Sequence, residues 1–117
     1  MSRYLLLIHA DESAWDSLTS EERDGAYERY SALARDMEER GHARGGDELA
    51  SATRAKVVRV REGVRTVVDG PFVETKEQLG GYFVVECDLE TALEYAARIQ
   101  AADHGAVEVR QVVEGPS

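Results

Sequence analysis

Residues 80–87 read GGYFVVEC, and residues 4–9 near the N-terminus read YLLLIH. Both runs are short, and both are apolar at odd and even positions alike, as in Leu5, Leu6 and Leu7. Side chains of a strand alternate between its two faces, so a strand that is apolar throughout is usually central in a sheet and covered on both sides. These two runs therefore predict the middle strands of one sheet.

Two helical segments, residues 19–40 and about 88–102, follow these strands along the chain. Thr19 and Glu22 have the spacing of a capping box, in which each side chain bonds the backbone N–H of the other residue. Gly41 is placed to end the first helix, because glycine accepts left-handed dihedral angles. The predicted buried stripes are Ala26, Tyr30, Leu33, Ala34 and Met37 in the first helix, and Leu89, Ala92, Leu93, Ala96 and Ile99 in the second.

The remaining strands complete a recognisable order. Residues 43–49 predict a weak strand and residues 106–113 predict the last one, while residues 55–68 predict a hairpin that turns at Glu62-Gly63. The order β-α-β, hairpin, β-α-β indicates an α+β sandwich of the ferredoxin-like kind. In that topology the first and third main strands are central, which agrees with the two runs that are apolar on both faces.

Two helices cover only one face of a four-stranded sheet, which leaves the apolar side chains of the other face without a cover. Contiguous exposed apolar patches usually mark an interface. We therefore expect a homodimer in which two sheets pack face to face, since closed two-fold symmetry is the commonest arrangement of soluble oligomers. The alternative is that the hairpin of residues 55–68 folds back over its own sheet.

The composition excludes several classes of protein. The 117 residues carry 14 Lys and Arg against 23 Asp and Glu, a formal charge of −9, and the length suits one domain spanning residues 1–117. This balance argues against binding to nucleic acid or to anionic membranes, because both require clustered cations. Cys87 is the only cysteine, which excludes an intramolecular disulfide and fits a cytoplasmic location. The apolar run from Tyr4 to Ile8 is too short for a signal peptide. The chain contains no apolar run of about 18 residues, so we expect no membrane span.

Residues 69–82 read DGPFVETKEQLGGY, the most specific stretch of the chain. Asp69 can accept N–H bonds from the turn that it opens, and the Gly-Pro that follows ends the preceding strand. One interpretation is a well-specified turn in which Phe72 fills the edge of the core. The other is a functional loop that places Asp69, Glu74 and Lys76 at the mouth of a pocket.

This stretch closely resembles the DGPF signature of the YCII-related bacterial proteins. The similarity extends over nearly the whole chain, including the first strand, the acidic first helix, the Glu62-Gly63 hairpin and the run GAVEVR at residues 105–110. The resemblance implies a ferredoxin-like fold that forms a dimeric α/β barrel, and it implies no particular reaction. Some relatives carry a histidine associated with the first helix and an aspartate that suggest acid–base chemistry; helix 19–40 contains no histidine here, so that pair is not carried over.

The histidines are the first candidates for chemistry. His9, His42 and His104 are not spaced from one another or from Cys87 as in common zinc motifs, so we expect no metal. The chain has no Walker loop and no dinucleotide fingerprint, and we expect no cofactor. His9 ends a predicted central strand, and with Asp69 it is a candidate catalytic residue, acting as a general base if its ring faces the dimer cleft. The alternative is a strand-end histidine satisfied by backbone or water.

Glu108 and Arg110 are two residues apart in the last predicted strand and so point to the same side. Their alternation with Val107 and Val109 fits a polar lining inside a barrel, where they would bind a substrate together with Glu74 and Lys76. It fits equally a solvated edge or a salt bridge between subunits. Arg110 would matter most if it bound a carboxylate through both arms of its guanidinium group.

The predicted hairpin is locally basic, with cations at Arg54, Lys56, Arg59, Arg61 and Arg65. Such cations either prevent edge aggregation or form a docking surface for an acidic protein partner. Two functions remain open, and whether the chain is an enzyme remains open with them. One is a small-molecule-binding protein or cofactor-independent enzyme. The other is a non-enzymatic accessory protein with a regulatory partner, which the resemblance also suggests because some family members are encoded beside extracytoplasmic-function sigma factors.

Overall fold

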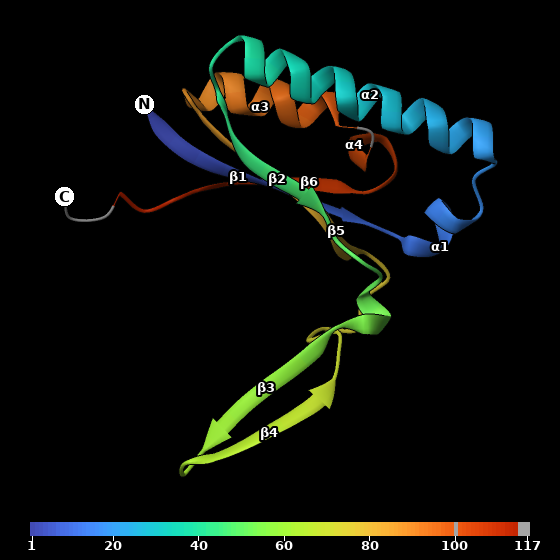
Figure 1. Cartoon of the computed structure of the whole chain (residues 1–117), viewed down its shortest axis with the longest axis vertical. Coiled ribbons are helices and arrows are strands. Elements are labelled where there is room, and N and C mark those ends of the chain that lie inside the picture. The colour runs from blue at the N-terminus through green and yellow to red at the C-terminus, as the bar shows by residue number, and fades with distance from the viewer. Residues whose placement is uncertain (100, 115–117) are drawn as a thin grey trace.

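The chain forms a four-stranded antiparallel sheet with its two long helices packed against one face (Figure 1). The structure is a computed structural model that describes residues 1–99 and 101–114. The strands are β1 (Ser2–Ala10), β2 (Ala43–Glu48), β5 (Gln78–Cys87) and β6 (Ala106–Gln111), in the spatial order β2-β5-β1-β6. This arrangement is α+β and is compatible with a ferredoxin-like fold. The two apolar runs do form the central strands, as predicted.

The first long helix, α2 (Ser20–Glu39), begins and ends as its sequence predicts. Thr19 Oγ1 accepts from the Glu22 N–H at 3.1 Å, while the Glu22 carboxylate accepts from the Thr19 N–H at 2.9 Å. Gly41 follows the helix with φ 75°. This capping box satisfies N–H groups that have no partner within the helix.

The second helical region is shorter than expected. Helix α3 (Leu89–Arg98) stops at Ile99, whose backbone is extended, and α4 (Ala101–His104) follows it. The prediction of one helix over residues 88–102 was therefore too long, and residue 100 lies outside the described residues. Two short elements were not predicted: α1 (Glu12–Asp16) and the 3-10 helix η1 (Ala52–Arg54).

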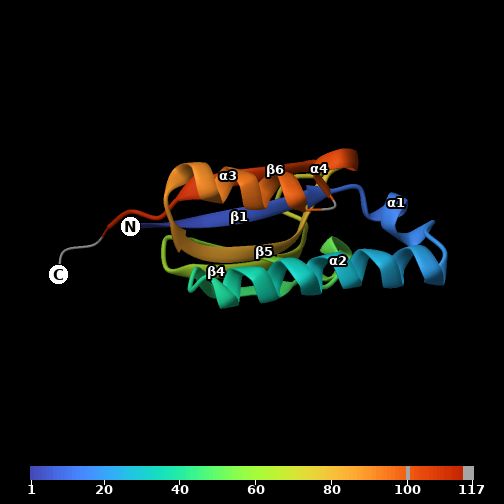
Figure 2. The same ribbon diagram turned by 90° about the horizontal axis from the view of Figure 1, so that it is seen from above.

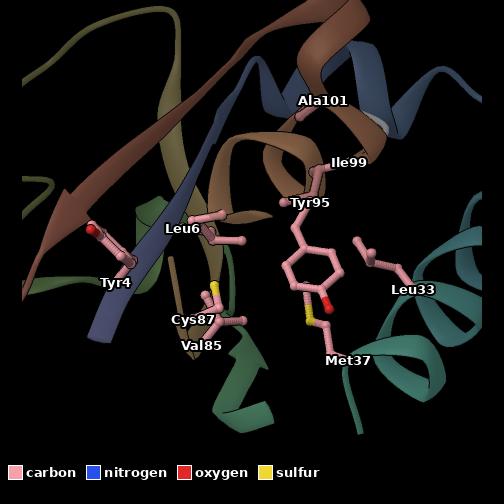
Figure 3. Packing of buried hydrophobic residues seen from close by; sticks show 10 residues of the cluster. Tyr4, Leu6, Leu33, Met37, Val85, Cys87, Tyr95, Ile99 and Ala101 are labelled. Atoms are coloured by element: carbon pink, nitrogen blue, oxygen red, sulfur yellow. The ribbon is translucent and has the colours of Figure 1, made fainter. Parts of the chain in front are cut away.

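The core lies between the helices and the sheet (Figure 3). Leu6, Leu33, Met37, Val85 and Tyr95 are almost completely buried there. The predicted stripe of α3 needs correction, because Leu89 and Leu93 are 51% and 43% exposed. Ala92 and Ala96 of that stripe, and Ile99 just after the helix, are buried as predicted, and Tyr95, which was not predicted, is buried with them.

The opposite face of the sheet, here called the open face, has no helix over it (Figures 1 and 2). Along β1, Tyr4 and Leu6 are buried against the helices, so Leu5 and Leu7 point to the open face. Tyr82 and Val84 of β5, which pair with Leu7 and Leu5, lie on the same face. All four side chains are partly exposed. The expectation that one apolar face stays uncovered within the chain is confirmed.

The predicted hairpin is present, but it does not cover the open face. Strands β3 (Lys56–Arg61) and β4 (Val64–Asp69) form a separate two-stranded sheet. Glu62 and Gly63, with φ 50° and 77°, make the two-residue turn. Figure 1 shows the hairpin slanting away from the body on the side opposite the helices, and Figure 2 shows it behind the sheet. Every residue of both strands except Val57 is exposed, so the alternative in which the hairpin folds back over its own sheet is wrong.

This projection gives the molecule an angular shape. Its principal dimensions are 48 × 47 × 17 Å and its radius of gyration is 16.2 Å, whereas a compact domain of 100 residues has a radius of about 13 Å. No helix in the described part of the chain is long and apolar enough to cross a membrane.

Candidate functional site

The clearest grouping of predicted site residues is a histidine–carboxylate pair on the open face. His9 lies near the end of β1, opposite Ala106 of β6. Its Nε2 is 3.4 Å from Oε1 of Glu108, one step further along the same face of β6. The two side chains are 33% and 48% exposed, so the pair is open to solvent in the single chain.

Backbone packing brings this pair together. Gly105 immediately precedes β6, and a Cβ atom at this position would overlap the carbonyl oxygen of His9. Only a residue without a side chain allows β6 to start this close to the end of β1. The β5 ladder also shifts register between Ile8 and His9, which leaves His9 opposite Leu79. His9 thus lies opposite a bulge at Gly80 of β5, and side chains beside bulges are often re-aimed.

Arg110 lies on the same face as Glu108 and opposite Leu5 in β1. Its side chain is exposed, and no carboxylate among the described residues lies within ion-pair distance of it. A guanidinium group without an internal partner can bind an external carboxylate through two parallel hydrogen bonds. The structure therefore places the imidazole, carboxylate and guanidinium groups of His9, Glu108 and Arg110 along one edge of the open face.

Asp69 is not joined to this group. It ends β4 opposite Lys56, and its Oδ1 is 2.5 Å from the Lys56 Nζ. The hydrogen bond and positive charge of Lys56 lower the pKa of Asp69 below its usual value. No hydrogen bond or ion pair in the described part of the chain connects Asp69 with His9. The two predicted catalytic residues are therefore not brought into contact, and the role of Asp69 visible here is at the base of the hairpin.

The signature loop after Asp69 is exposed. Phe72 is 75% exposed, so its predicted place at the edge of the core is wrong. The loop leaves the base of a hairpin that stands away from the core, and the ring instead lies 5.5 Å from the guanidinium carbon of Arg59. Inside the loop, the Gln78 side-chain amide donates to the carbonyl oxygens of Val73 and Thr75 at 2.8 and 2.9 Å. The loop is held by its own hydrogen bonds rather than by apolar packing.

Glu74 and Lys76 are both exposed in this loop. Hydrogen bonds from Ser13 are the main reason that the pKa of Asp11 is lowered, and the positive charge of Lys76 contributes to the same shift. The charge of Lys76 thus acts on Asp11, which follows β1 two residues beyond His9. No ion pair within the described residues involves Glu74.

Glu12 has a structural role that the sequence did not predict. The Glu12 carboxylate of α1 accepts from the backbone N–H of Ala52 at 2.6 Å and from the Ser51 hydroxyl at 2.8 Å. These bonds tie the start of the hairpin to the end of β1. No periodicity or motif marks such a contact, since its partners are some 40 positions apart.

Two hollows of the single chain lie elsewhere. A groove of about 450 Å³ runs between α2 and β2, and a shallow hollow of about 750 Å³ lies on the surface of α2. Neither is lined by any of the predicted site residues. Across the described ranges, no group of three or more His, Cys, Asp or Glu side chains is arranged to hold a metal ion.

Comparison with known proteins identifies the family to which the chain belongs. The YCII-related domain matches residues 2–115 of the chain. An uncharacterized protein of Rhizobium meliloti (strain 1021) is 36% identical over 110 residues, which cover 92% of this chain and 89% of that protein. The match spans the strands, the hairpin and the signature loop, as the resemblance of residues 69–82 predicts. The chain belongs to the YCII-related domain family.

Proposed function

We propose that this protein binds a small carboxylate-bearing molecule on the open face of its sheet, as a dimeric binding protein or a cofactor-independent enzyme. The observation that carries the proposal is the His9–Glu108 pair beside Arg110, which has no ion pair with a carboxylate of the described residues. These three groups come from facing strands, and they border the apolar side chains of Leu5 and Leu7. A site with a few convergent polar groups on an apolar floor is the usual chemistry of a small-molecule pocket.

The pair suits proton transfer. Glu108 lies within ion-pair distance of Nε2 of His9, and a carboxylate beside an imidazole can orient the ring for acid–base chemistry. With the proton of His9 on Nε2 toward Glu108, Nδ1 carries the free lone pair and can take a proton from a bound molecule. Arg110 would hold the carboxylate of that molecule at the side of the pair.

The site needs a cover before it can exclude water. The open face is bare in the single chain, and neither hollow described above reaches His9. We propose that a second copy supplies this cover, so that the pocket exists only in the homodimer. Lys76 and Glu74 of the signature loop would then lie at its mouth, near the β1–α1 junction.

Ligand-induced shifts in NMR spectra test the proposal. A panel of small mono- and dicarboxylates is added at millimolar concentration, and the His9 imidazole and Arg110 Nε signals are followed. We expect at least one compound to move both signals, and Arg110→Lys to weaken its binding about tenfold because the charge stays but the forked geometry is lost. His104→Asn is the control, since His104 is also exposed but outside the site. If no carboxylate moves either signal in the intact dimer, the proposal is wrong.

The exposed hairpin favours a second candidate, a non-enzymatic accessory protein. Arg59, Arg61 and Arg65 stand on a projecting basic element that an acidic protein partner can reach, and a regulator linked to extracytoplasmic-function sigma factors is one such partner. Affinity capture with the wild-type chain and with Arg59→Glu/Arg61→Glu tests this candidate. It is contradicted if both baits retain the same proteins.

A further inference from the structure

The open face is electrically polarised along its strands. Toward the end that holds His9 it carries two carboxylates, those of Asp47 and Glu108. Toward the start of β1 it carries three arginines and one carboxylate, which are Arg3, Arg44, Arg110 and Glu86. Three cations and one acid give this end a formal charge of +2, although the whole chain carries −9. A concentration of positive charge on an acidic protein attracts anions to that end of the face.

The strand register places Arg3 beside Arg110. Arg110 is directly opposite Leu5, and Arg3 lies two residues before Leu5 on the same side of β1. The ladder continues past β6, because the Val112 N–H donates to the Arg3 carbonyl oxygen at 2.9 Å. Arg3 and Arg110 are thus diagonal neighbours, whose Cα atoms lie about 7–8 Å apart, a spacing that long side chains can bridge. Two guanidinium groups at this spacing can reach the same bound molecule.

Glu86 is neutralised mainly by Arg44 rather than by Arg3. The Arg44 Nε and Nη2 groups donate to Glu86 Oε2 at 3.2 and 2.9 Å, and its Nη1 donates to the carbonyl oxygens of Gly41 and Ala43. Every nitrogen of the Arg44 guanidinium group therefore has a partner. Arg3 makes one 3.5 Å contact with Glu86, through Nε. Its two terminal nitrogens have no hydrogen-bond partner in the described part of the chain, and its side chain is 56% exposed.

Apolar side chains separate the arginines from the His9–Glu108 pair. Leu5 and Leu7 lie between Arg3 and His9 on the open face of β1, and neighbouring side chains on one face of a strand are about 7 Å apart. A ligand held at the arginines thus has its body over the leucines before it reaches the imidazole. The face separates an anion-binding end from a proton-transfer end.

We infer that the molecule bound on the open face is a dicarboxylate, with one carboxylate on Arg110 and the second on Arg3. A guanidinium group binds a carboxylate through two parallel hydrogen bonds, so two neighbouring groups suit two carboxylates. The formal charge of +2 at this end also matches the −2 of such a ligand. The inference rests on the proposed function, because both arginines belong to the same site.

Matched pairs of ligands test the inference. Succinate and glutarate are each compared with their monomethyl esters, which keep the carbon chain and lose one charge, and dissociation constants are taken from the His9 and Arg110 NMR signals. We expect each dicarboxylate to bind the wild type at least about tenfold more tightly than its ester, because a second charge-assisted pair forms. Arg3→Gln should remove this preference and leave the affinity for the esters unchanged. Glu86→Gln should increase the preference, because Arg3 then loses its internal competitor.

The matched control is Arg35→Gln, which removes an exposed arginine of α2 and should keep the preference. Equal affinities of the wild type for dicarboxylates and esters overturn the inference while the proposed function stands, whereas absence of all binding removes both. The inference is also overturned if Arg3→Gln keeps the preference. Sedimentation velocity addresses the other use of these charges, ion pairs between subunits. If Arg3→Gln weakens self-association and changes no ligand affinity, Arg3 is a subunit contact and the inference is wrong.

Discussion

At the scale of single residues, His9 shows how backbone geometry selects a candidate site. A histidine at the end of a strand has no fixed partner until a second strand brings one. Here β6 brings Glu108 to 3.4 Å, and it does so because Gly105 lets the chain turn directly against the His9 carbonyl. The pairing thus depends on a residue that has no side chain and makes no contact with Glu108 through one.

Gly105→Ala should therefore disturb the pair. The added methyl group would overlap the His9 carbonyl oxygen, so β6 must move away from β1, at a cost of about 1–3 kcal/mol for overpacking. We expect a lower urea midpoint together with shifted His9 imidazole signals. Gly80→Ala is the control, because nothing lies within 4 Å of a Cβ there. Equal effects of the two substitutions would show that close approach at Gly105 is not the cause.

The buried face of the sheet supports a second prediction. Leu6 is 0% exposed, and Leu6→Ala should lower the free energy of unfolding by about 2–5 kcal/mol through lost burial and a cavity. Leu93→Ala removes the same atoms from a position that is 43% exposed, and it should change the unfolding free energy by less than about 0.5 kcal/mol. Urea titrations of both variants at one protein concentration make the comparison. A large loss of unfolding free energy in Leu93→Ala would mean that Leu93 lies on the buried face of α3, as its place in the helical stripe predicts.

At the scale of elements, the start of α2 depends on local bonds more than on packing. Its first turn is exposed, so the capping box has little help from the core. Thr19→Ala should cost about 0.5–2 kcal/mol of stability. Ser31→Ala, in the exposed middle of the same helix, should stay within about 0.5 kcal/mol of wild type. Thermal unfolding followed by circular dichroism distinguishes them, and matching curves would mean that α2 does not need its cap.

The same elements show what a sequence can predict and what it cannot. The capping box, the Glu62-Gly63 turn and the two central strands depend on neighbours within a few residues, and all were predicted correctly. The α3 face was wrong at two positions, because Leu89 and Leu93 fit a helical stripe as well as Tyr95 does. Which stripe is buried depends on where the sheet lies, and there the phenol of Tyr95 also gains a 2.7 Å contact with His42 Nδ1.

The candidate site could be predicted only in part, as could the helices and strands. Alternation placed Glu108 and Arg110 on one side of their strand, and β6 confirms it. The contact between His9 and Glu108 was not predicted, because it depends on the register of strands almost 100 residues apart in sequence. The direction of the hairpin was unpredictable for the same reason, since Glu12 holds its root through contacts with Ser51 and Ala52 some 40 positions away.

At the scale of the whole molecule, acid should weaken the fold. Arg44 first and Arg3 second lower the pKa of Glu86 from the ordinary value of 4.5, and Arg98 lowers the pKa of Asp36 from 3.8. The folded state therefore holds these protons less tightly than the unfolded state. Their stabilisation is complete above the ordinary values and is lost as the pH falls through the lowered ones.

We expect urea midpoints that are flat from pH 7 to pH 5 and fall below about pH 4.5. Glu86→Gln should start lower at pH 7 and lose less on acidification, because it no longer has a proton to gain. Gln111→Ala is the control, because it changes an exposed β6 residue and no carboxylate, and it should keep the full acid loss. Gln78→Glu would not serve as a control, because it adds a carboxylate. Parallel curves for wild type and Glu86→Gln would show that the Arg44 contact does not contribute.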